Sequence, residues 1–113
     1  MHELSIMESA LSQACQQAKA EGASRICSIK LRIGALSGVV PEALEFAFEA
    51  LAPGTMAEGG RLVVEPVPAR FRCRACEREF EAGELFSLCP TCQEPSTDLR
   101  SGREMELASL EIE

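Results

Sequence analysis

Apolar residues recur at three- and four-residue steps near the start of the chain, a pattern typical of a helix with one buried face. The stripe consists of Leu4, Met7, Leu11, Ala14, Cys15 and Ala18. We therefore expect a helix over residues 4–21, followed by Gly22, which suits the left-handed position after a helix. Ser5 and Glu8 match a capping box and favour a start just after Ser5. The stripe favours a start one turn earlier, and both starts remain open.

Four further segments show the pattern of regular structure. Over residues 25–34 apolar and polar side chains alternate, which predicts a strand with one buried face. Pro41 suits the first turn of a second helix, and residues 53–54, Pro-Gly, end that helix. A second strand is expected at about 61–67, and periodicity returns at 103–113 as a third strand.

Residues 69–100 break this periodicity, because cysteines, charges and turn residues dominate there. Two Cys-x-x-Cys pairs, Cys73 with Cys76 and Cys89 with Cys92, stand about a dozen residues apart, less than the usual zinc-ribbon spacing. Two facing pairs give the tetrahedral four-thiolate site that zinc favours, although an iron site of rubredoxin type remains open. Four thiolates leave no open position for a substrate. The sequence thus predicts a structural metal, zinc in the first place.

The cysteine segment carries too few apolar side chains to fold alone, and metal binding would supply the missing free energy. Its larger apolar residues are Phe71, Phe80, Leu85, Phe86 and Leu88. The predicted fold is α+β, with two helices on a three-stranded mixed sheet and an inserted four-cysteine zinc-ribbon module. In this prediction 1–68 and 101–113 form an α/β domain, and 69–100 form the module between strands two and three.

The chain is acidic, with eleven basic and eighteen acidic residues among 113 and a formal net charge of −7. This charge argues against a nucleic-acid binder and against binding to an anionic membrane surface. The cysteine segment carries five Arg and six acidic residues, so a nucleic-acid-binding zinc ribbon stays only a rival hypothesis. No apolar run approaches the length of a bilayer span. The first residues lack signal-peptide features, so a cytoplasmic location is expected.

The only histidine is residue 2, where it has a specific capacity to chelate a metal. The α-amine of Met1, the amide nitrogen of His2 and its imidazole can form adjacent chelate rings around one ion. The amide of Glu3 is a further candidate nitrogen. Planar nitrogen sites suit Ni(II) or Cu(II), and composition does not select between them. The alternative is that His2 is simply a solvated terminal residue.

Several motifs together resemble the HypA family, also called HybF, of hydrogenase nickel-incorporation proteins. They are the opening residues 1–7, Leu31–Gly34, Val40–Glu42, Gly54–Gly60 and the paired-cysteine insert. The resemblance implies a metallochaperone, not an enzyme, that helps place nickel in the large-subunit precursor of [NiFe]-hydrogenases together with a HypB-type GTPase. Some relatives also serve urease. We expect a monomer or a weak homodimer.

The same resemblance implies the metal ligands. Nickel would bind at Met1, His2 and Glu3 in the α/β domain, and structural zinc would bind the four cysteines. The chain departs from common zinc ribbons after each Cys-x-x-Cys pair, where Glu77 and Gln93 replace the frequent glycine. The insert contains no histidine, so the fourth nickel ligand must be a backbone nitrogen, Glu3, water or a partner protein.

Overall fold

The computed structural model describes residues 2–82 and 87–113, and the chain divides into two compact units. The first unit comprises Met1–Arg32, Val39–Glu65 and Glu106–Glu113. The second comprises Ile33–Gly38 and Pro66–Met105. The second unit is thus wider than the predicted insert of residues 69–100, because it also includes residues 33–38. The independence of that insert stays a prediction.

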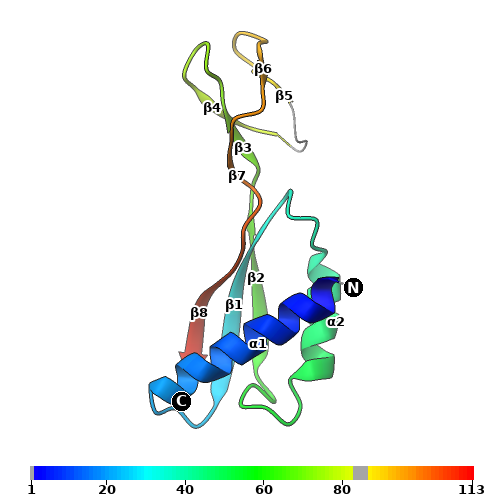
Figure 1. The fold of residues 1–113 in the computed structure, drawn as a ribbon, viewed down its shortest axis with the longest axis vertical. Helices are drawn as coiled ribbons and strands as arrows, with labels where there is room; N and C mark the ends of the chain where they lie inside the picture. Colours follow the sequence, from blue (N-terminus) through cyan, green and yellow to red (C-terminus); the bar gives the residue numbers. More distant parts are fainter. Residues whose placement is uncertain (1, 83–86) are drawn as a thin grey trace. The chain divides into compact units, whose positions relative to one another are not determined.

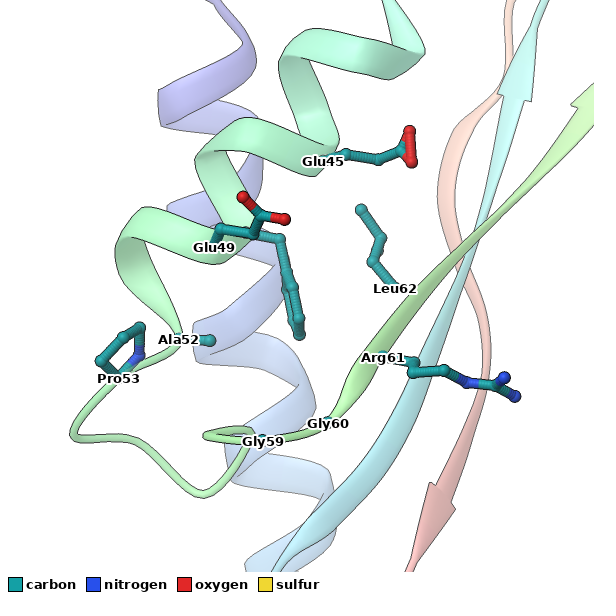
Figure 2. A pocket seen from close by; sticks show the side chains of 9 residues that line it. Glu45, Glu49, Ala52, Pro53, Gly59, Gly60, Arg61 and Leu62 are labelled. Atoms are coloured by element: carbon teal, nitrogen blue, oxygen red, sulfur yellow. The ribbon is translucent and has the colours of Figure 1, made fainter.

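Two helices and a three-stranded sheet form the α/β part of the chain. The helices are α1 (His2–Ala20) and α2 (Pro41–Leu51), and they lie on one face of the sheet (Figures 1 and 2). The sheet has the order β2-β1-β8, with β1 at Ile26–Gly34, β2 at Arg61–Val67 and β8 at Met105–Ile112. None of the helices in the described residues is both long and apolar enough to cross a membrane.

The sheet is mixed, as the hydrogen bonds at its strand ends show. The N–H of Ala35 donates to the carbonyl of Val67 just beyond β1, so β2 runs parallel to β1, with α2 as the crossover. The N–H of Gly34 donates to Glu104 and that of Glu113 to Arg25, so β8 runs antiparallel to β1. The opposed arrows of β1 and β8 are visible in Figure 2. The predicted fold class is confirmed.

The helix α1 begins at His2, so the earlier of the two predicted starts is correct. Most of its stripe is buried, with Leu4 (47% exposed) and the partly buried Cys15 as exceptions. On β1, Ile29, Leu31 and Ile33 are buried as predicted. The core of this part is therefore mainly aliphatic, with Phe48 of α2 as a buried aromatic residue, which agrees with a chain that has no Trp or Tyr.

The polar side of β1 carries an ion network across the three strands. Arg32 on β1 contacts Glu65 on β2 and Glu106 on β8, each at 3.3 Å. Lys30 contacts Glu65 at 3.3 Å. Hydrogen bonding from Arg32 is the main cause that holds the pKa of Glu65 below its ordinary value. Exposed pairs of this kind contribute little stability, but they favour the observed strand register.

Short strands build the second unit around the cysteines. One sheet has the order β4-β3-β7 and a second pairs β5 with β6. Their bounds are β3 Arg70–Arg72, β4 Glu79–Glu81, β5 Ser87–Leu88, β6 Pro95–Ser96 and β7 Leu99–Ser101. Phe71 lies opposite Phe80, and their rings stack with centroids 5.8 Å apart. The predicted apolar residues Leu85 and Phe86 lie outside the described residues.

We predict that Gly34→Ala strongly destabilises the second unit. A Cβ on Gly34 would overlap the backbone of Gly102 and Arg103. Overpacking costs about 1–3 kcal/mol, and we expect the upper end because backbone cannot rotate away. The measurement is the free energy of unfolding of the metal-loaded protein in urea. The control is Gly38→Ala, where φ is +82° but no atom lies within 4 Å of the added carbon. Its expected cost is about 1 kcal/mol, and an equal cost at both positions would contradict the steric explanation.

Candidate metal centre

The four predicted cysteine ligands come together in the second unit. Their sulfur atoms all lie within 4.8 Å of one another. The Sγ atoms of Cys73 and Cys92 are 3.4 Å apart, and those of Cys76 and Cys89 are 3.6 Å apart. Zinc–sulfur bonds of about 2.3 Å place tetrahedral sulfurs about 3.8 Å apart. These separations exceed a disulfide bond and fit one tetrahedral ion.

The two Cys-x-x-Cys turns have the same backbone design. The N–H of Cys73 donates to Arg78, and the N–H of Glu77 donates back to Cys73, at 2.8 and 2.7 Å. Sixteen residues further on, the N–H of Cys89 donates to Glu94 at 2.9 Å, and that of Gln93 donates to Cys89 at 2.8 Å. Each pair of hydrogen bonds closes a tight turn that directs two sulfurs toward one point.

The residue after each turn adopts the left-handed backbone region. Glu77 has φ = 62° and Gln93 has φ = 66°, and they are the only described residues besides glycine with positive φ. The turns therefore keep the geometry for which glycine is favoured, although the side chains there cost about 1–2 kcal/mol each. Replacement of the usual glycines by Glu77 and Gln93 therefore leaves the backbone conformation of the two turns unchanged.

The four sulfurs differ in burial and in acidity. Cys73 and Cys89 are 1% exposed, whereas Cys92 is exposed. A hydrogen bond from the backbone N–H of Cys92 is the main cause that lowers the pKa of Cys89 to about 6. The backbone of Glu94 lowers the pKa of Cys92, but contact with Cys73, burial and the other thiols together raise it to about 12. Burial raises the pKa of Cys76. Ionisation of all four thiols thus calls for a cation among them.

A buried serine that the sequence analysis missed supports the second turn. Ser96 is 6% exposed, and its hydroxyl donates to the carbonyl of Arg72 at 2.6 Å. The same oxygen accepts the N–H of Asp98 at 3.2 Å. Ser96 therefore ties β6 to β3 beside Cys73. The sequence Ser-Thr-Asp at residues 96–98 is typical of a turn and could have indicated a local role for Ser96. Its hydrogen bond to the carbonyl of Arg72, 24 residues away, could not be predicted from the sequence.

The predicted nickel ligands are only partly described. Met1 lies outside the described residues, and His2 contributes the first residue of α1. The carboxylate of Glu3 accepts a hydrogen bond from the backbone N–H of Val40 at 3.2 Å. Val40 is the N-cap residue of α2 and has no capping side chain of its own. The third residue of the predicted nickel motif thus joins the starts of the two helices.

Comparisons with known proteins identify related sequences over the full chain. A family described as "Hydrogenase/urease nickel incorporation, metallochaperone, hypA" matches residues 1–112. The chain is 47% identical to the hydrogenase maturation factor HypA of a Picosynechococcus species over 112 residues, with 99% of each chain covered. It is 43% identical to that of Geobacter metallireducens over 113 residues, with both chains fully covered.

Solved structures agree with the fold. A solution structure described as HypA protein is 25% identical and superimposes with a TM-score of 0.72, covering 99% of this chain and 96% of the other. The solution structure of the Ni metallochaperone HypA from Helicobacter pylori gives a TM-score of 0.66 at 24% identity, covering 97% and 96%. This second likeness is one of fold.

We predict that glycine after each Cys-x-x-Cys turn stabilises the metal-loaded module. Glu77→Gly with Gln93→Gly removes the left-handed strain but adds the entropy of glycine, for a net gain of about 1 kcal/mol. The gain should appear as a higher free energy of unfolding and slower loss of metal to a chelator. Glu77→Ala with Gln93→Ala is the control, because alanine keeps the strain and loses the same Arg72–Glu77 ion pair. An equal gain from alanine would show that strain is not the cause.

Proposed function

This chain belongs to the HypA family of nickel-incorporation metallochaperones, and we propose that it binds Ni(II) at its N-terminus and helps deliver it to the [NiFe]-hydrogenase large subunit. The observation that carries this proposal is the family match over residues 1–112, which includes the N-terminal motif and all four cysteines. The chain then acts as a carrier and not as an enzyme. Its partners would be a HypB-type GTPase and the large-subunit precursor, in the cytoplasm, with the chain as a monomer or weak homodimer.

The start of α1 supports nickel binding through backbone nitrogens. The first four N–H groups of a helix have no acceptor within the helix. The amides of His2 and Glu3 can therefore lose their protons to nickel without breaking a helix hydrogen bond. With the α-amine of Met1 and the His2 imidazole, they complete four nitrogens, the planar set that Ni(II) favours. The negative charge of deprotonated amides also offsets the positive end of the helix dipole.

The role of Glu3 follows from its contact with Val40. Its carboxylate accepts the Val40 N–H, so it already has a structural partner at the start of α2. We therefore assign the backbone nitrogen of Glu3, and not its carboxylate, as the fourth nickel ligand. Its side chain would hold the nickel-binding turn against α2.

We assign a structural zinc ion to Cys73, Cys76, Cys89 and Cys92. The sulfur separations fit a tetrahedral ion, and zinc and iron are the metals that such a site favours. Bound there, the ion supplies folding free energy to a unit with a small core. The chain's own part is to aim the sulfurs with its two turns and to lower the pKa of Cys89 through backbone N–H groups.

The decisive experiment is a nickel titration of the zinc-loaded protein with an intact Met1, beside His2→Ala. The unmodified protein should bind one nickel per chain, with the visible absorption of a planar Ni(II) site. His2→Ala should lose nickel and retain its zinc, as measured by metal analysis. Affinity should rise with pH through the range in which imidazole and α-amine lose their protons, about pH 6.5–8. Equal nickel binding by both proteins would contradict the N-terminal site.

Substitution of Glu3 separates its backbone from its side chain. Glu3→Ala should still bind one nickel with planar absorption, because the amide nitrogen remains. It should lower the free energy of unfolding of the nickel-free protein by about 1 kcal/mol, because the hydrogen bond that caps the N–H of Val40 is lost. Glu8→Ala, an exposed residue on the same helix, is the control. Loss of planar nickel binding in Glu3→Ala alone would assign the carboxylate as a ligand instead.

A further inference from the structure

A cavity of about 360 Å³ opens between α2 and the start of β2, within the first unit. Phe48 and Leu62 contribute apolar surface, and Glu45 and Glu49 also line the cavity. Figure 2 shows Glu45 extending from α2 above Leu62, toward β2, whereas Arg61 extends away from the helix. The cavity thus combines an apolar floor with two carboxylates, and Arg61, which also lines it, directs its guanidinium away from them.

The two glutamates are electrostatically unfavourable in their own helix. Glu45 and Glu49 stand four residues apart on α2, a spacing at which like charges repel. Glu49 also lies in the last turn, near the negative end of the helix dipole, and no basic residue occupies that turn. Among the described residues neither carboxylate has an ion-pair partner. A cation in the cavity would relieve this repulsion, so the site favours a basic ligand.

The adjoining surface of α2 exposes an aromatic ring. Phe46 is 73% exposed, the highest value among the large apolar residues that the structure describes as exposed. Glu42 precedes it by four residues and Glu49 follows it by three, so both border it on the helix surface. Covering a phenyl ring releases free energy. We call Glu42, Glu45, Phe46, Glu49 and the cavity beside them the α2 acidic surface.

We propose that the α2 acidic surface docks a segment of a partner protein that carries an arginine or lysine beside an apolar residue. The aliphatic stem of that basic side chain matches the floor formed by Phe48 and Leu62, with its cation near Glu45 and Glu49. The apolar neighbour covers Phe46. A bare metal ion would leave the floor and the ring uncovered. The net charge of −7 also favours a basic partner segment over an acidic one.

The test uses the GTPase as the partner, and in this choice the proposal rests on the proposed function. Binding of the zinc-loaded full chain to the purified GTPase is measured by calorimetry at several salt concentrations. Glu45→Gln with Glu49→Gln should weaken binding about tenfold and reduce its salt dependence. Phe46→Ala should weaken binding by about the same factor and leave the salt dependence unchanged.

The matched control is Glu21→Gln with Glu111→Gln, which removes two charges from exposed positions in the same unit. The affinity of this control for the GTPase should stay within about twofold of the affinity of the unmodified chain. The proposal is overturned if this control weakens binding as much as the α2 variants. It is equally overturned if the α2 variants bind at full strength, or if the unmodified chain does not bind the GTPase. Nickel titration of the same samples separates the two proposals, because a chain that binds nickel but not the GTPase contradicts only the docking surface.

Discussion

The gathering of four cysteine sulfurs within 4.8 Å is the constraint on which the second unit depends. Thiols this close cannot all ionise without a cation, and the opposed pKa shifts of Cys89 and Cys92 express that conflict. Two of the sulfurs, on Cys73 and Cys89, also belong to the small buried core of the unit. Metal binding and core formation are therefore one event here. The left-handed strain at the two turns is tolerable because the ion offsets it.

The proposed nickel site follows the opposite design. A four-sulfur site is closed, with its ligands fixed by two hairpins, so exchange requires those hairpins to open. The proposed N-terminal site uses the first turn of a helix, where the amide N–H groups have no acceptor within the helix itself. A cargo ion must leave as well as bind, and ligands at the chain's end can be displaced one at a time. Glu3 provides a fixed point through the hydrogen bond that its carboxylate accepts from Val40.

The elements that bury apolar faces could be predicted from the sequence, because periodicity reports burial directly. β1, β2 and both helices lie within a few residues of their predicted bounds. The cysteine cluster was equally predictable, since ligand chemistry and spacing are local. Contacts such as Glu3 with Val40, or Ser96 with Arg72, join residues that no local pattern relates. The strands of the second unit were missed for a related reason: segments of two or three residues are too short to show a period.

The carboxylates on α2 show that exposed residues can indicate a binding surface when the repulsion among them is considered. A solvated face explains why Glu42, Glu45 and Glu49 are tolerated, but it does not explain why they repel one another beside an exposed phenyl ring. Salt bridges were available to this chain, since β1, β2 and β8 share a network around Arg32. On α2 two of the carboxylates instead border a cavity whose lining arginine, Arg61, extends away from the helix and forms no ion pair with them. A surface that is unfavourable alone and complementary to a basic segment is what a transient docking site requires, because binding supplies the charge that the helix lacks.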